Sequence, residues 1–521
     1  MSDIAISFAI LLAVVVAFIS NRVPVGIVAI GASLALYFTG VLDVNQALAG
    51  FGDPTVIFIA TLFVVSEGLD ASGVTAWAGQ ELIARVGDSR TRLLVLMVLL
   101  VAGLTALISV NGAVAALLPV IVVLAVRLGR SPSQLLIPLV FGAHAGSMLA
   151  LTGTPVNVIV SAAAVDYGGR PFGFFEFALV GVPLVIGAIL IVVFLGERLL
   201  PTRTPKGIPS DFSRHAKTLV DQYRLEAAPS SLIDRTSGLA EVVVPPRSGM
   251  VGQTVFPGMV TDSGDLVVLA IQRKGEDRGP GESVLAVGDT LLLQGTWAAL
   301  DENLDDPDVL VVDAPDLVRR QAVPLGLKAG EAIAVLAGMV VLLATGIVPS
   351  AVAGLLAASA MVLFRVVTPE GAYRSISWTT VVLVAGMIPL STAMTQTGAA
   401  DLVADNLVRI VGGAGPYALL AGLFLITAVL GQLISNMATA LIVIPIAAAA
   451  ALELGLSAQP VLMSVTVAAA ASFLTPVATP VNMMVMGPGG YRFGDYWKLG
   501  LVFMAMYFVV AVFLVPVFWP F

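Results

Sequence analysis

Long apolar segments separated by short polar stretches dominate the hydrophobic pattern of this chain. In the first part of the sequence they lie near residues 4–20, 24–42, 55–72, 92–127, 133–165 and 176–198. Six further segments follow near residues 329–345, 349–367, 380–397, 416–451, 459–487 and 498–519. A helix that crosses a membrane needs about 20 predominantly apolar residues. The pattern therefore predicts an α-helical polytopic membrane protein.

The second set of apolar segments repeats the first at a nearly constant distance. The sequence Thr-Pro-Val-Asn occurs at Thr154–Asn157 and again, 325 residues later, at Thr479–Asn482. The same distance relates further identical residues, namely Thr55 and Thr380, Gly73 and Gly398, and Ser147 and Ser472. This indicates an internal duplication. Duplicated membrane proteins whose repeats break at polar, proline-containing positions are typical of secondary transporters.

The fourth apolar segment of each half is too long for one span. Each has about 36 residues and a polar centre, at residues 109–112 in the first half and 435–439 in the second. Either two spanning helices or one re-entrant hairpin explains this length. We favour the hairpin, which places the polar centre deep in the membrane beside protein or a water-filled cavity.

Five crossings then remain in each half, and an odd number predicts repeats of inverted topology. If residues 201–325 are cytoplasmic, only Arg170 and Arg409 among the loop cations fall outside, as the positive-inside rule requires. Residues 4–20 lack a basic leader and are expected to remain as a helix. We predict membrane repeats at 1–200 and 326–521, external termini, and a prokaryotic-type inner (plasma) membrane location.

Residues 201–325 differ in kind from both halves. They hold 12 of the 26 Lys and Arg residues and 18 of the 34 Asp and Glu residues. Alternating apolar positions bounded by Gly-Asp pairs predict strands at Ala240–Val244, Leu266–Ile271 and Thr290–Leu293. We predict a connector over 201–234 and a small α+β domain with its core at 235–312.

The overall composition supports the membrane assignment and excludes several classes of function. The chain of 521 residues is 58% hydrophobic and 12% charged, with a mean hydropathy of +0.99 and a net charge of −8. It contains no cysteine, which excludes disulfides and thiol chemistry. Neither a phosphate-binding loop nor a hydrolase elbow occurs, so we do not expect an enzyme. The negative charge gives no reason to expect a nucleic-acid partner.

An anion inside the membrane needs positive potential, yet the predicted spans carry essentially no Lys or Arg in their interiors. Helix N-termini, hydroxyl and amide donors, and co-bound cations remain as sources. The polar centres and the broken segments could form two related half-sites that each hold a cation, with the anion between them. These half-sites would lie at residues 109–112, 152–157, 435–439 and 475–482.

Other functions stay open from the residues alone. Glu67 and Asp70 could couple transport to protons, although the second half has Thr392 and Thr395 at the corresponding positions. His144 is expected to be a packed or interfacial residue rather than a proton relay. A gated ion channel is less favoured, because no selectivity filter resembling T-V-G-Y-G occurs.

The Ser-Asn tips, followed by Gly153–Asn157 and Ala478–Asn482, resemble the divalent anion/sodium symporter family of the ion transporter superfamily. The resemblance covers both membrane halves. It implies a homodimer in membrane lipid and an elevator-type mechanism. It also implies Na⁺-driven uptake of a dicarboxylate, a tricarboxylate or sulfate. The same superfamily includes proton-coupled antiporters and arsenite exporters, which are the alternatives.

The resemblance also implies residue roles. Substrate contacts are expected at Ser109, Asn111, Gly112, Thr154, Ser435, Asn436, Met437, Thr479 and Pro480. Na⁺ ligands are expected at Thr105, Ser109, Asn111, Gly153, Asn157, Ser435, Asn436, Thr439, Ala478, Pro480 and Asn482. The tips of the family carry Ser-Asn-Thr, whereas here Val110 interrupts the first tip and Met437 replaces threonine in the second. Loss of both threonine hydroxyls leaves a smaller anion such as sulfate open.

Within the insert, the run from Glu241–Val244 through Leu266–Arg273 to Gly288–Leu293 resembles the C-terminal (RCK_C) domain of TrkA-type regulators. This resemblance implies dimerisation and raises a regulatory nucleotide as a ligand. The Rossmann lobe that accompanies such domains is missing. A domain that only stabilises the dimer is therefore at least as well supported as a sensor.

Overall fold

A computed structural model describes most of the chain. The described residues are 2–20, 22–86, 89–128, 130–203, 223, 237–261, 263–279, 281–304, 308–312, 326, 328–411 and 415–521. They belong to two compact units, and the first comprises residues within Met1–Leu69, Glu81–Pro209 and Gly330–Phe521. The second comprises residues within Asp70–Gln80 and Ser210–Ala329. Apart from 201–203 and 223, the predicted connector at 201–234 lies outside the described residues.

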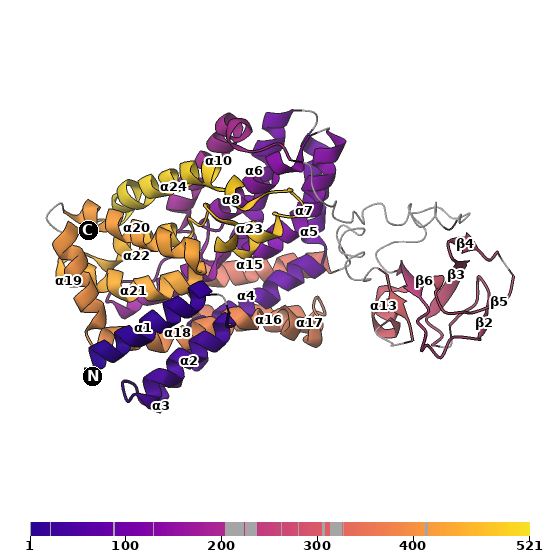
Figure 1. Cartoon of the computed structure of the whole chain (residues 1–521), viewed down its shortest axis with the longest axis horizontal. Helices are drawn as coiled ribbons and strands as arrows, with labels where there is room; N and C mark the ends of the chain where they lie inside the picture. Colours follow the sequence, from indigo (N-terminus) through magenta and orange to yellow (C-terminus); the bar gives the residue numbers. More distant parts are fainter. Residues whose placement is uncertain are drawn as a thin grey trace. The chain divides into compact units, whose positions relative to one another are not determined.

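Helices make up both halves of the membrane part (Figure 1). The first half contains α1 (Asp3–Ser20), α2 (Val25–Phe38), α3 (Val44–Leu48), α4 (Pro54–Ala71), α5 (Val74–Val86), α6 (Arg90–Leu107), α7 (Val110–Arg127), α8 (Leu136–Gly146), α9 (Pro155–Asp166) and α10 (Ala178–Leu199). The second half contains α15 (Ala329–Thr345), α16 (Ser350–Leu363), α17 (Pro369–Ser375), α18 (Trp378–Gln396), α19 (Ala399–Val411), α20 (Pro416–Leu433), α21 (Asn436–Glu453), α22 (Ala458–Ala469), α23 (Pro480–Met484), α24 (Trp497–Val509) and α25 (Val515–Phe518).

Eight helices among the described residues are long and apolar enough to cross a membrane. The prediction of a helical polytopic membrane protein is thereby confirmed. Helices of the first half pack directly against helices of the second half. In Figure 1, α18 of the second half lies along α1 and α2 of the first, and α24 lies beside α10.

The two long apolar segments are each a pair of helices joined by a sharp break. Helix α6 ends where Ile108 is extended, and α20 ends where Ile434 is extended, so the chain reverses without a connecting loop. Each arm has 18 residues, which gives a length of about 27 Å. We call the breaks at residues 108–112 and 434–439 the first and second hairpin tips.

Besides the short helices α3 and α17, the sequence pattern missed one longer helix in each half, α5 and α19. Each is amphipathic rather than apolar and follows the end of an apolar helix, α4 or α18. The helix change occurs at Gly73 and Gly398, which have φ angles of +78° and +77°. Glycine adopts this left-handed conformation without strain. These two glycines are 325 residues apart, so their pairing in the sequence reflects the same helix end in both halves.

The second unit contains the strands predicted from the insert. Strands β1 (Ser237–Val243), β3 (Leu266–Arg273) and β6 (Asp289–Thr296) form the centre of a five-stranded sheet of order β4-β3-β6-β1-β7. The edge strands are β4 (Glu276–Asp277) and β7 (Leu310–Val311), and β2 (Thr254–Val255) pairs with β5 (Ser283–Val284) separately. Helix α13 (Trp297–Asn303) contributes Trp297 and Leu300 to a core with Val242, Ile271 and Leu291.

Candidate functional site

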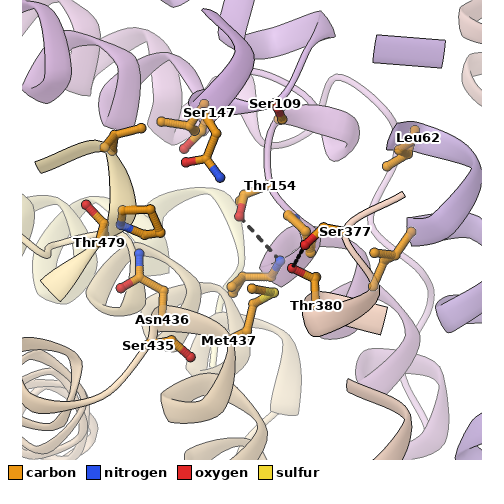
Figure 2. Close-up of a pocket in the computed structure, with 18 of the residues that line it drawn as sticks. Leu62, Ser109, Ser147, Thr154, Ser377, Thr380, Ser435, Asn436, Met437 and Thr479 are labelled. Carbon is orange, nitrogen blue, oxygen red and sulfur yellow. Dashed lines mark hydrogen bonds between the residues drawn. The ribbon is translucent and has the colours of Figure 1, made fainter. Parts of the chain in front are cut away.

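Helices α8 and α9 are separated by a break at residues 147–154, and α22 and α23 by a break at 470–479; we call these two pairs the broken helices. Both hairpin tips and both broken helices line one cavity of about 410 Å³, which we call the first cavity. Figure 2 shows side chains from the two halves facing each other across it. The expected site residues that line it are Ser109, Asn111, Gly153, Thr154, Ser435, Asn436, Met437, Ala478, Thr479 and Pro480. Segments more than 300 residues apart in the sequence therefore meet in one place.

Each hairpin tip is closed by a serine that caps the second arm of the hairpin. The Ser109 hydroxyl accepts a hydrogen bond from the Gly112 N–H at 3.2 Å. The Ser435 hydroxyl accepts one from the Ala438 N–H at 3.3 Å. Such caps satisfy backbone donors that the first turn of a helix leaves unpaired. The two serines thus start α7 and α21 at the cavity wall.

Each broken helix is held by an asparagine that bridges the break. The Asn157 amide donates to the backbone oxygens of Ser147 and Ala150, at 2.9 and 2.8 Å. The Asn482 amide donates to those of Ser472 and Thr475, at 2.9 Å in both bonds. Every residue of the second set lies 325 positions after its counterpart in the first. The duplicated Thr-Pro-Val-Asn motif is therefore a duplicated clamp across the break.

Both clamping asparagines leave their carboxamide oxygens unused. Asn157 Oδ1, Asn482 Oδ1 and Thr439 Oγ1 are buried and have no hydrogen-bond partner within the described part of the chain. Burying such an atom without a partner costs free energy. Only two other described side-chain atoms share this property, in Ser464 and Tyr507. Hydroxyl and carboxamide oxygens suit hard cations such as Na⁺. The oxygens of Asn157 and Thr439 can therefore act as cation ligands without breaking an existing bond, whereas Asn482 also has the His144 side chain as a neighbouring hydrogen-bonding group.

The first cavity has an unusual electrostatic character, since none of its described lining residues is Lys, Arg, Asp or Glu. Positive potential comes instead from the N-termini of α7, α9 and α21, which begin at Val110, Pro155 and Asn436 on the cavity wall. Hydroxyl and amide groups supply hydrogen-bond donors. This arrangement fits a small anion with many oxygen acceptors.

Four expected cation ligands and one expected substrate contact lie outside the cavity wall. Asn157, Thr439 and Asn482 are fully buried and are not among its lining residues. The Thr105 hydroxyl donates to Val101 O at 2.8 Å and also approaches Ala102 O. Gly112 uses its N–H for the Ser109 cap. The assignment of Thr105 as a Na⁺ ligand stays a prediction.

Sequence reasoning missed the polar residues that α18 and the inner helices bring to the cavity. Ser377, Thr379 and Thr380 line it at the start of α18, where the Ser377 and Thr380 hydroxyls lie 2.9 Å apart (Figure 2). Thr466 lines it from α22, and Thr152 lines it from within the predicted half-site at 152–157. The signal that could have found Thr380 was its pairing with Thr55 in the duplication.

His144 is 4% exposed and packs edge-on against Phe473, as expected for a packed residue. It is also the single ionisable group among the described residues that line the first cavity. Its Nε2 lies 3.4 Å from the Thr479 hydroxyl. Glu67 and Asp70 do not line this cavity, and the Asp70 carboxylate accepts a hydrogen bond from Thr75 at 2.7 Å.

A second cavity has a volume of about 350 Å³. It includes the start of α4, whereas the first cavity includes the start of α18. The second cavity is lined by Asp53, Thr55, Asp166 and Tyr167, and by polar residues near the end of α18. Thr55 here corresponds to Thr380 of the first cavity. Neither hairpin tip lines the second cavity.

Comparisons with known proteins agree with this architecture. The family model of the citrate transporters matches residues 15–468 and 393–521. The uncharacterized transporter YfbS of Escherichia coli K12 is 31% identical, over 97% of this chain and 98% of its own length. Sodium/sulfate cotransporter 1 of Chlamydomonas reinhardtii is 28% identical over 57% of this chain and 34% of its own.

Among solved structures, that of the Alcanivorax borkumensis YdaH transporter aligns with 91% of this chain and 87% of its own, at 13% identity and a TM-score of 0.48. The match to the family model extends over nearly the entire chain, through both hairpins and both broken helices. This chain belongs to the citrate transporter family.

Proposed function

We propose that this protein is a Na⁺-coupled symporter of a small divalent oxyanion. The observation that carries the proposal is the pair of asparagine clamps. Each clamp directly follows a residue of the cavity wall, Val156 or Val481, and buries a carboxamide oxygen that has no hydrogen-bond partner among the described residues. A cation at each clamp would satisfy these oxygens. It would also provide the positive charge that the side chains of the cavity wall lack. Anion binding would then require Na⁺, which is the basis of symport.

Sulfate is the first substrate to test, followed by dicarboxylates and citrate. Three helix N-termini and several hydroxyls face the first cavity, and such donors suit a compact tetrahedral oxyanion. Met437 occupies the tip position where the symporter family that this chain resembles has a threonine. One donor for a longer carboxylate is thereby lost. A relative is named as a sodium/sulfate cotransporter, which supports the same choice.

The transport cycle in this proposal is alternating access of the elevator type. The first cavity includes the start of α18, and the second includes the corresponding start of α4. In our proposal the hairpins and broken helices move between the two, so that the tips face each cavity in turn. The proposal also includes a homodimer with residues 201–325 in the cytoplasm and external termini. The sheet unit would stabilise that dimer, with a regulatory nucleotide as a separate question.

Uptake into proteoliposomes tests the proposed function. Radiolabelled sulfate, succinate and citrate would be offered with and without an inward Na⁺ gradient. We expect accumulation of sulfate only with the gradient, and a loss of most uptake in Asn157→Ala and Asn482→Ala. Glu67→Gln serves as the control and should transport normally.

The alternative is a proton-coupled antiporter or an anion or arsenite exporter. Accumulation that follows a proton gradient and disappears in Glu67→Gln would replace our proposal with this alternative. Absence of uptake of all three anions, in vesicles that contain folded protein, would also count against symport.

A further inference from the structure

Ser472 lies between the second hairpin tip and the second broken helix. Its side chain is fully buried, and its hydroxyl donates a hydrogen bond to Asn436 Oδ1. Its backbone oxygen accepts the hydrogen bond from the Asn482 clamp at 2.9 Å. One residue therefore contacts both the tip, which lines the first cavity, and the clamp asparagine, whose buried oxygen has no hydrogen-bond partner among the described residues.

The counterpart of Ser472 in the first half has a different hydroxyl partner. Ser147 likewise accepts from its clamp through the backbone oxygen, at 2.9 Å. Its hydroxyl, however, donates to the backbone oxygen of His144 at 2.8 Å, whereas the corresponding distance from the Ser472 hydroxyl to Ala469 O is 3.4 Å. Both halves thus share the hydrogen bond from the clamp asparagine to the serine backbone oxygen, which is a feature of each break. The bond to a tip asparagine occurs in the second half.

The hydrogen bond from Ser472 fixes which side of the Asn436 carboxamide faces the cavity. A carboxamide has an acceptor oxygen on one side and two N–H donors on the other. Because Oδ1 is held by the buried serine, the amide nitrogen is the group left for the cavity that Asn436 lines. An anion requires donors, whereas a cation requires oxygens.

We infer that Ser472 is a positioning residue that turns the Asn436 amide toward the anion. In this arrangement Asn436 recognises the substrate, while Asn482 Oδ1 and Thr439 Oγ1 serve the cation. The two expected roles of Asn436 are thereby separated. The inference rests on the proposed function, because it assigns a role at the same anion site.

The test compares Ser472→Ala with Ser464→Ala. Both changes remove a buried hydroxyl, but that of Ser464 on α22 has no hydrogen-bond partner among the described residues. We expect Ser472→Ala to raise the KM for the transported anion about tenfold, the effect of one hydrogen bond to a charged group. The Na⁺ concentration for half-maximal uptake and the maximal rate should change less than about twofold, because the substitution leaves Asn482 Oδ1 and Thr439 Oγ1 in place. Ser464→Ala should leave the KM unchanged.

A double substitution separates positioning from a general packing effect. If Ser472 acts through Asn436, then Asn436→Ala already removes its contribution. The KM of Asn436→Ala/Ser472→Ala should therefore equal that of Asn436→Ala alone. Independent, multiplying effects would overturn the inference, as would equal KM values for Ser472→Ala and Ser464→Ala. If the unsubstituted protein shows no Na⁺-dependent uptake, the proposed function fails, and this inference with it.

Discussion

Single polar atoms decide the chemistry of this site. The side chains of Asn157, Asn482 and Thr439 are fully buried, and each keeps one oxygen without a partner among the described residues. An unsatisfied buried oxygen lowers the stability of the cation-free protein. A bound cation would recover that free energy, because it binds the folded state and not the unfolded one. In the proposed symporter, stability and cation affinity are therefore opposed at these positions.

Thr439→Val tests this opposition, since it replaces the hydroxyl by a methyl group of similar size. Without Na⁺, we expect the variant to be more stable by ~1 kcal/mol, because an unpaired polar atom is removed. Its Na⁺ affinity should fall roughly tenfold, as for other losses at metal sites. Thermal unfolding in detergent across a Na⁺ titration measures both quantities. Ser464→Ala is the matched control and should gain stability with no change in Na⁺ response.

At the scale of single elements, turns are fixed by a few residues with defined hydrogen bonds. Ser109 and Ser435 start the second arms of the hairpins, and Gly73 and Gly398 end α4 and α18. In the sheet unit, Asp289 begins β6 and is fully buried. Its carboxylate accepts two hydrogen bonds of 2.7 Å from Arg273 on β3 and one from the Ala286 N–H. This ion pair joins two neighbouring strands.

The strand pair β3–β6 should weaken at acidic pH. The hydrogen bonds from Arg273, aided by the Ala286 N–H, lower the pKa of Asp289 in spite of its burial. A carboxyl whose pKa is lowered by folding contributes stability above its unfolded pKa of about 3.9, and this contribution is lost as the pH falls toward the folded pKa. Hydrogen exchange of β3 and β6, corrected for intrinsic rates, should show constant protection at neutral pH and a decline below about pH 4.

The same measurement on Asp289→Asn provides the control. This variant cannot titrate at position 289, so its protection should be lower at neutral pH and should depend less on acid. A variant with the same acid profile as the unsubstituted protein would show that another carboxyl is responsible.

At the scale of the whole molecule, the helical unit contains the entire candidate site. All described residues that line the first cavity belong to this unit, although they come from both halves of the sequence. The sheet has a hydrophobic core of its own, which includes Ala240, Val242 and Trp297. The two parts of the chain can therefore be separated experimentally.

Replacing residues 235–312 by a flexible Gly/Ser linker should leave transport intact. The site residues keep all their contacts, and the hydrogen bond from the Gly326 N–H to Ser72 O, at 2.8 Å, also remains. We expect Na⁺-dependent uptake per folded protein to stay within about twofold, since surface insertions are tolerated far better than core changes. The oligomeric state would be measured alongside uptake. Loss of the folded helical unit would contradict this division.

The sequence by itself determined the helical membrane architecture, the duplication and the strands of the insert. These features depend on local hydrophobicity and on periodicity, which are visible along the chain. The Thr-Pro-Val-Asn repeats also pointed to two segments that line the first cavity. Amphipathic α5 and α19 escaped notice, because their polar faces interrupt the apolar pattern.

Only the tertiary structure decided which groups meet and which atoms are satisfied. The α18 hydroxyls and His144 reach the cavity through packing of the two halves, which no local pattern encodes. The same holds for the Asn157 and Asn482 oxygens, which have no partner in the described part of the chain, since a hydrogen bond depends on distance and direction in space. Sequence identifies the residue types at a site, whereas the fold determines which of their donors and acceptors remain available to a ligand.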